Sequence, residues 1–321
     1  MSRTAILLLA HGTPNRLSEM SDYLQHVTGG RPMPPHIISE LQHRYAEIGL
    51  REDPLPAGPP LTRWTLRQAE LLEKQIGCKV YVGMRNWHPF IADTVAQMRS
   101  DGVTHARVLC LAPQNSRTST GLYKRALDAA VAGAFTYDFI AGWADEPLLA
   151  QAFAERLQPV LAEAHAPVLF TAHSVPCRTI RATTAEEAAN AGPVPAEGIQ
   201  SYGAATEGDP YPIECKQTAA SVAKLVGLQD HEWYFAFQSQ GVAGAPWIGP
   251  TVEDTLKALA EEGHKAVVIQ PIGFLCDHVE ILYDIDINFR EVASALGMKL
   301  YRPESLNDSQ TLIRALAHVL A

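Results

Sequence analysis

Two histidines stand where apolar segments of the chain end. His11 follows the apolar residues 5–10, and His173 follows the apolar residues 168–172, with Pro176 shortly after it. Because proline cannot donate to a strand ladder, each segment is interpreted as a buried strand that presents one imidazole at its carboxyl end. A histidine with a pKa near its usual value of about 6.5 can accept a proton or bind a transition metal at neutral pH. The alternative is a purely structural histidine with satisfied hydrogen bonds.

A third group of polar residues lies in the segment 277–288. Asp277 is a candidate helix N-cap, with Glu280 at the third helical position. Glu280, Asp284 and Asn288 are spaced four residues apart, so a helix places them on one face. Such a stripe is either a solvated helix face or a row of oxygen ligands for a divalent cation, and imidazole with one carboxylate suits Fe(II).

The elements that position these residues repeat along the chain. Apolar runs alternate with amphipathic segments in the same order in both halves, which predicts parallel sheets covered by helices on both faces. We therefore expect an α/β fold of two similar Rossmann-like halves, each a parallel four-stranded sheet flanked by helices, facing across a cleft. Ligands bind at the carboxyl ends of such strands. The predicted strands are residues 5–10, 79–84, 105–113, 168–172, 233–237 and 264–271.

The repeat divides the chain into residues 1–150 and 151–321. The first half contains an excursion, residues 28–60, whose proline and glycine content is typical of a lid over a pocket. The second half carries His173 and Glu280, the candidate metal ligands, together with an insertion at 178–207 that is poor in large apolar residues. We expect a surface segment there, with a helix over 184–191.

Composition excludes several classes of protein. The chain of 321 residues has a net charge of −9, which argues against a nucleic-acid partner. Its longest apolar run is too short to span a bilayer or to form a signal peptide, so we expect a cytoplasmic protein. Five cysteines without a C-x-x-C pair predict free thiols.

Several motifs together resemble the ferrochelatase family over nearly the whole chain. This resemblance implies a lyase that inserts Fe(II) into a porphyrin, coproporphyrin III or protoporphyrin IX, in haem biosynthesis. The motifs are Thr-Ala-His-Ser-Val-Pro at 171–176, Gly-Asp-Pro-Tyr at 208–211, Phe-Gln-Ser at 237–239, Pro-Trp-Ile-Gly-Pro at 246–250, Pro-Ile-Gly-Phe at 271–274, Asp-His-Val-Glu-Ile-Leu-Tyr-Asp at 277–284 and Ala-Pro-Gln-Asn-Ser at 112–116.

The resemblance also implies roles for individual residues. His173 would accept pyrrole protons and bind iron, with Glu280 as its catalytic partner on the opposite wall. The metal path would consist of His173, Glu280, Asp284 and Asn288, although the family often has an acid where this chain has Asn288. The implied contacts to the tetrapyrrole are His11, Arg44, Tyr45 and Tyr123.

Three departures from the family pattern bear on the substrate site. His11 stands where the coproporphyrin-using form commonly has tyrosine, so it is a candidate axial contact to iron. Thr28 replaces an expected arginine, and the insertion at 178–207 lengthens a link that is usually short.

The expected partners are porphyrin and Fe2+ as substrates, for a chain that acts as a monomer. No permanently bound cofactor is expected, and no 2Fe–2S cluster, because no cysteine follows Cys276. Two alternatives stay open. One is a cobalt or nickel chelatase for another tetrapyrrole, and the other is a non-catalytic tetrapyrrole or metal carrier.

Overall fold

The computed structural model describes residues 3–53, 55, 56, 58–180, 209–240 and 246–321. Apart from residues 178–180, the predicted insertion and its helix at 184–191 lie outside the described residues. None of the described helices is long and apolar enough to cross a membrane. The five cysteines are free thiols, as predicted, and all but Cys78 are buried.

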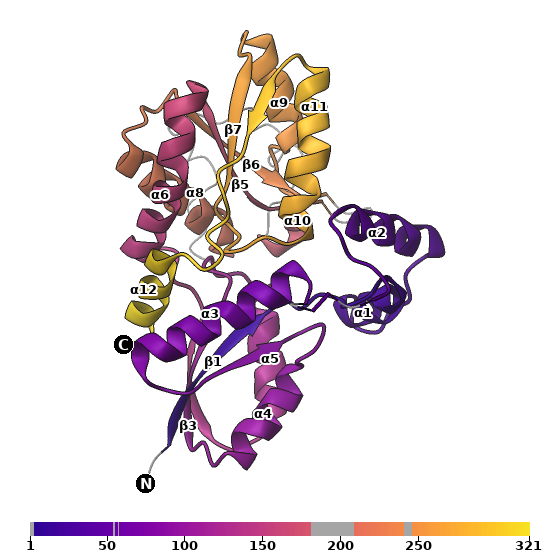
Figure 1. Cartoon of the computed structure of the whole chain (residues 1–321), viewed down its shortest axis with the longest axis vertical. Coiled ribbons are helices and arrows are strands. Elements are labelled where there is room, and N and C mark those ends of the chain that lie inside the picture. The colour runs from indigo at the N-terminus through magenta and orange to yellow at the C-terminus, as the bar shows by residue number, and fades with distance from the viewer. Residues whose placement is uncertain (1–2, 54, 57, 181–208, 241–245) are drawn as a thin grey trace.

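Two four-stranded parallel sheets form the centre of the molecule (Figure 1). Their strand orders, β2-β1-β3-β4 and β6-β5-β7-β8, are the same when counted within each half, which confirms the predicted fold class. The central strands are apolar throughout because helices cover both of their faces. The first sheet consists of β1 (Thr4–Ala10), β2 (Val80–Met84), β3 (His105–Cys110) and β4 (Thr136–Ile140), and the second of β5 (Val168–His173), β6 (Trp233–Gln238), β7 (Ala266–Pro271) and β8 (Lys299–Tyr301).

The helices repeat along with the strands. α3 (Pro60–Ile76) and α8 (Tyr211–Val226) each end at a glycine with positive φ, Gly77 at 66° and Gly227 at 79°. Glycine adopts this conformation without the steric cost that a Cβ would bring. α4 (Ile91–Ser100) and α9 (Val252–Glu261) follow the second strand of their halves. The two halves therefore share local sequence signals as well as topology.

The turns that follow the second strands also correspond. In the first half the Met84 N–H donates to the Pro89 carbonyl at 2.7 Å, and in the second the Phe237 N–H donates to the Pro250 carbonyl at 2.8 Å. Each hydrogen bond folds the chain back beside the carboxyl end of its strand. These turns position Arg85, which directly follows β2, and Gln238, the last residue of β6.

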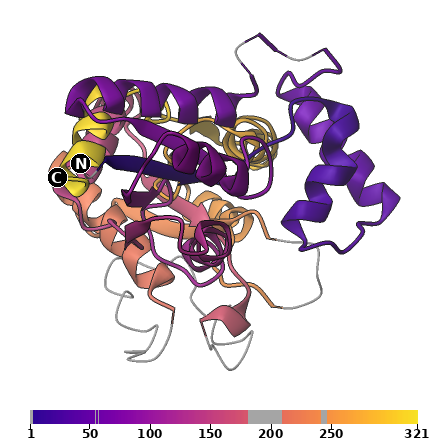
Figure 2. The same ribbon diagram turned by 90° about the horizontal axis from the view of Figure 1, so that it is seen from below.

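Two helices join the halves. α6 (Pro147–Ala164) follows β4 but packs on α8 and β7, whereas α12 (Gln310–Val319) follows β8 and packs on α3 and α6 (Figures 1 and 2). One buried apolar cluster consequently runs through both halves, with Leu8, Phe153 and Phe170 among its members. This shared core fixes the position of the carboxyl ends of one sheet relative to those of the other.

A small helical lobe, residues 17–50, lies at the margin of the molecule and overlaps the excursion expected at 28–60 (Figures 1 and 2). It contains α1 (Met20–Val27) and α2 (Pro35–Glu47). Its own core includes Met20, Tyr23 and Tyr45, and Val279 of the second half packs against that core. The lobe therefore contacts both halves. The other helices of the described residues are α5 (Thr120–Val131), α10 (Val279–Leu282), a π-helical turn (Asp284–Phe289), α11 (Arg290–Ala295) and two short 3-10 helices (Leu17–Glu19 and Cys177–Thr179).

Candidate active site

His173, the last residue of β5, forms an ion pair with Glu280 of α10. The imidazole Nε2 lies 3.2 Å from the Glu280 Oε1, and the other ring nitrogen, Nδ1, donates to the Ser174 carbonyl. The Tyr211 hydroxyl donates to the His173 carbonyl at 2.9 Å, which anchors the strand end. Burial disfavours the imidazolium, but the Glu280 carboxylate outweighs burial and raises the pKa of His173 to about 9.

Glu280 contacts His278 as well as His173. Its Oε2 lies 3.3 Å from His278 Nε2, and the other ring nitrogen of His278 donates to the Cys276 carbonyl at 2.9 Å. Burial opposes ionisation of the carboxyl, yet His173 and His278 keep the pKa of Glu280 well below its usual value. The pair is therefore an imidazolium and a carboxylate at neutral pH. His173 and Glu280 belong to the same half and touch, so they do not face one another from opposite walls as expected.

Gln238, the last residue of β6, links β5 to α10 through its side-chain amide. Its Nε2 donates to the Glu280 carbonyl at 2.8 Å, and its Oε1 accepts from the Thr171 hydroxyl at 2.7 Å. The Ser174 N–H donates to the Gln238 carbonyl at 2.7 Å. The side chain is 1% exposed and its amide is satisfied on both sides. Neither Gln238 nor His278 was singled out from the sequence, although both lie within the motifs quoted above.

The predicted helix cap at Asp277 is wrong. α10 begins after His278 and has no side-chain cap. The Asp277 carboxylate instead accepts from the Ser305 hydroxyl at 2.7 Å and the Asn307 amide at 3.0 Å, and lies 3.7 Å from Arg302. These partners come from the segment after β8, so local spacing could not reveal them.

Asp284 lies beside the ion pair, and Asn288 does not join it. The Ser239 hydroxyl donates to Asp284 Oδ2 at 2.5 Å, and an Arg44 guanidinium nitrogen lies 3.6 Å from Oδ1. Burial and then the Glu280 charge raise the pKa of Asp284 to about 6. Asn288 is partly exposed in the π-helical turn. Across the described ranges, no three His, Cys, Asp or Glu side chains lie close enough to hold a metal ion together.

His11 occupies the corresponding position in the first half, at the end of β1. Its Nε2 lies 2.9 Å from the Asn86 amide nitrogen, and its Nδ1 lies 3.1 Å from the Gly12 carbonyl and 3.2 Å from the Tyr23 hydroxyl. Burial, with the nearby Arg85 charge, lowers the pKa of His11 to about 4. The imidazole is therefore neutral, with Nε2 accepting from Asn86, and Asn86 must move before His11 can bind iron.

Three of the predicted tetrapyrrole contacts are affected by the charge of the Glu280 carboxylate. That charge acts on the pKa values of His11, Tyr45 and Tyr123, which belong to the first half. Tyr45 is buried in the lobe, where burial raises its pKa to about 12. Burial also raises the pKa of Tyr123, on α5. Arg44 pairs with Glu40 as well as with Asp284, and its guanidinium lies 5.3 Å from the centre of the Tyr283 ring.

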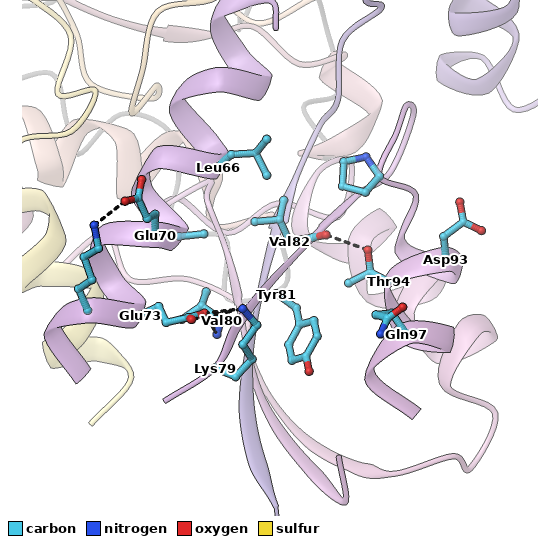
Figure 3. A pocket seen from close by; sticks show the side chains of 13 residues that line it. Leu66, Glu70, Glu73, Lys79, Val80, Tyr81, Val82, Asp93, Thr94 and Gln97 are labelled. Carbon is cyan, nitrogen blue, oxygen red and sulfur yellow. Dashed lines mark hydrogen bonds and ion pairs between the residues drawn. The ribbon is translucent and has the colours of Figure 1, made fainter. Parts of the chain in front are cut away.

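A separate hollow of about 530 Å³ lies along the outer edge of β2 (Figure 3). The figure shows Glu70 of α3 and Asp93 of α4 on either side of the strand. None of the predicted site residues lines this hollow, so the hollow is distinct from the site around Glu280. The lining residues are Leu66, Ala69, Glu70, Glu73, Lys74, Lys79, Val80, Tyr81, Val82, Pro89, Asp93, Thr94 and Gln97.

The architecture places the protein among α/β proteins built from two similar halves, each with a parallel four-stranded sheet. The solved sirohydrochlorin chelatase SirB from Bacillus subtilis subspecies spizizenii, in complex with cobalt, superimposes with a TM-score of 0.55 at 11% identity, over 98% of this chain and 93% of that one. Such a likeness establishes the fold alone.

Sequence comparison narrows that class to one family. The ferrochelatase family model matches residues 3–321. A ferrochelatase of Acidobacterium capsulatum is 55% identical over 99% of this chain and 93% of the relative. A coproporphyrin III ferrochelatase of Geobacillus kaustophilus is 32% identical over 98% and 94%. The chain belongs to the ferrochelatase family.

Proposed function

We propose that this protein inserts ferrous iron into a porphyrin, coproporphyrin III or protoporphyrin IX, as a step of haem biosynthesis. The observation that carries the proposal is the contact between the His173 imidazole and the Glu280 carboxylate, whose charge also acts on His11, Tyr45 and Tyr123. Family membership over residues 3–321 supports the same activity.

Iron capture begins at the ion pair. With its pKa raised to about 9, His173 is protonated at neutral pH and cannot bind a metal. An approaching Fe2+ brings a double positive charge beside Glu280, which favours loss of the imidazole proton and exposes the Nε2 lone pair. His173 and Glu280 then bind the ion from the same side. Asp284 and Asn288 supply oxygen atoms along the path of approach.

Proton removal follows from the same pair. Transfer of Fe2+ to the porphyrin nitrogens leaves a neutral His173 beside a carboxylate, and this state favours proton uptake. The two N–H protons leave the ring as the iron enters. His173 accepts one of them, and the partly exposed Glu280 carboxylate accepts the second and releases it to solvent. Since His173 and Glu280 touch, no macrocycle fits between them, and both act on one face of the ring.

The first half supplies the other wall. Arg44 and Tyr45 of the lobe and Tyr123 of α5 contact the tetrapyrrole, and His11 approaches its centre once Asn86 releases Nε2. The division of the chain at residue 150, with the lid-like excursion 28–60 in the first half and the insertion 178–207 in the sequence of the second, belongs to the same proposal. The monomeric state, the cytoplasmic location and the expected lack of a resident cofactor or 2Fe–2S cluster stay predictions from the sequence.

The test is an anaerobic insertion assay with Fe2+ and each of the two porphyrins, read from the absorption spectrum of the metalloporphyrin. Turnover with at least one porphyrin, and none with the His173→Asn variant, is expected. Tight porphyrin binding without turnover would instead support a carrier. Cobalt with sirohydrochlorin is a further arm, because the SirB structure shares the fold, and preference for that pair would replace the proposed reaction.

A further inference from the structure

Arg85, directly after β2, carries a guanidinium that lacks a counter-charge among the described residues. Its Nε is buried and has no hydrogen-bond partner. The guanidinium lies 5.8 Å from the centre of the Tyr123 ring. Its backbone N–H donates to the Ala10 carbonyl at 3.0 Å, so the base of the side chain is fixed against β1. A half-buried arginine without an acceptor is costly, because a desolvated charge needs a partner.

The charges around Arg85 add to this imbalance. Arg125, on α5, is close enough for its like charge to act on Arg85. The polar neighbours that Arg85 influences are neutral groups, the His11 imidazole and the phenols of Tyr23 and Tyr123. Arg44 differs, since Glu40 and Asp284 already compensate its charge. A positive region of this kind, in a chain with net charge −9, is complementary to an external anion.

The position of Arg85 indicates where that anion comes from. The charge of Arg85 acts on His11 and Tyr123, and both also experience the charge of Glu280 from the second half. Arg85 therefore lies with His11 and Tyr123 among the first-half residues that are proposed to contact the tetrapyrrole. The neighbouring Asn86 holds the His11 ring at 2.9 Å.

We propose that Arg85, assisted by Arg125, binds a carboxylate of the tetrapyrrole substrate at the wall formed by β2 and α5. The inference rests on the proposed function and adds a carboxylate subsite separate from Arg44 on the lobe. Guanidinium binds carboxylate through two parallel N–H···O bonds, which fixes the orientation of the bound group as well as its affinity. Porphyrin propionates are such carboxylates, so Arg85 sets how the ring is turned above the ion pair.

The experiment compares Arg85→Met and Arg85→Lys with a control, Arg99→Met, which removes an exposed arginine of α4. Porphyrin affinity is measured by fluorescence quenching, with coproporphyrin III, protoporphyrin IX and the tetramethyl ester of coproporphyrin III in the same detergent. Because a charge-assisted hydrogen bond is lost, Arg85→Met should bind coproporphyrin III about 10- to 100-fold more weakly. Arg85→Lys should recover part of the loss, and Arg99→Met should match wild type.

The ester separates recognition from a structural role. Wild type and Arg85→Met should bind the ester equally, since it offers no carboxylate. Thermal unfolding of Arg85→Met should occur at the wild-type temperature or above it, because an uncompensated charge has been removed. Equal binding of coproporphyrin III by both proteins, or equal weakening for acid and ester, would overturn the proposal.

The outcomes also distinguish the two proposals. Should wild type bind porphyrin and insert iron while Arg85→Met behaves identically, only the carboxylate subsite fails. Should wild type neither bind nor metallate any of the porphyrins, the proposed function fails and the subsite fails with it. A stronger effect on coproporphyrin III than on protoporphyrin IX would show that Arg85 meets a propionate that protoporphyrin IX lacks.

Discussion

The His173 Nε2 and the Glu280 Oε1 lie 3.2 Å apart, one at the end of β5 and the other on α10. They meet because β5 and β7 are neighbours in the sheet, and the segment after β7 returns across the end of β5. The same contact explains why His173 is protonated at rest while Glu280 is ionised. Proton transfer and metal binding are therefore coupled at one pair of side chains.

His173→Asn should abolish iron insertion and leave porphyrin affinity within a few-fold of wild type. Asparagine keeps a polar side chain at the site but cannot take up a proton, and a positioned general base contributes about 10²- to 10⁴-fold to a rate. Stopped-flow absorbance under anaerobic conditions measures the rate, and fluorescence quenching measures porphyrin binding. His165→Asn, at the end of α6, is the matched control, and a variant at His173 with more than a tenth of wild-type turnover would contradict the assignment.

Metal binding at neutral pH should release about one proton from His173, since its raised pKa keeps the ring protonated until a metal displaces the proton. Metal affinity should then rise with pH and level off above about pH 9, where the imidazole is already neutral. Titration calorimetry with Zn2+, a redox-stable substitute, in buffers of different ionisation enthalpy counts the protons. In Glu280→Gln the histidine pKa should fall, because burial remains and the carboxylate charge is gone. Release of no proton by wild type would refute the resting ion pair.

Arg302→Met should destabilise the fold far more than Arg156→Met. Arg302 is 13% exposed and donates to both oxygens of Asp286 at 2.6 and 2.7 Å, and it lies 3.7 Å from Asp277. Its removal takes the two-point partner from Asp286, which keeps only Arg290 at 3.6 Å, and leaves Asp277 with the neutral donors Ser305 and Asn307. The expected cost is about 2 kcal/mol in the free energy of unfolding. Arg156 pairs with Glu304, which is 79% exposed, so its loss should cost less than about 1 kcal/mol. Equal urea midpoints for the two variants would be the contrary result.

Gln238→Leu should lower kcat about tenfold or more while leaving the porphyrin KM nearly unchanged. The substitution leaves the Glu280 carbonyl and the Thr171 hydroxyl without their partner, and the carboxylate shifts relative to His173. Gln151→Leu is the control, because that amide lies on the exposed face of α6 and contacts only Glu155. Adding Thr171→Val to Gln238→Leu should restore stability but not kcat, since the alignment of Glu280 is still lost. Recovery of both stability and kcat in the double variant would show that Gln238 has only a structural role.

The sequence predicted the parts of the fold that depend on local patterns. The strands agree to within a few residues because buried parallel strands are apolar throughout, and the resemblance pointed to His173 and Glu280 before any geometry was known. β4 and β8 were not among the predicted strands, and the other missed features depend on distant segments. Asp277 is drawn away from α10 by Ser305 and Asn307, and α6 and α12 each pack against the half opposite to the strand they follow. Gln238 is a link between two elements, and no pattern within β6 marks it.

His11 should make the stability of the protein depend on pH in a defined window. Its pKa is about 4 in the folded protein and about 6.5 in an unfolded chain, so between these values the unfolded state binds more protons. Stability should therefore rise as pH increases from 4 to 6.5, by up to about 3 kcal/mol from this group. His11→Gln removes the titrating ring and should flatten the curve in that window, whereas the control His43→Gln, exposed on α2, should keep the wild-type slope. Urea unfolding at half-unit intervals of pH measures the slope for each variant. Identical slopes for wild type and His11→Gln would show that burial does not keep the His11 imidazole neutral.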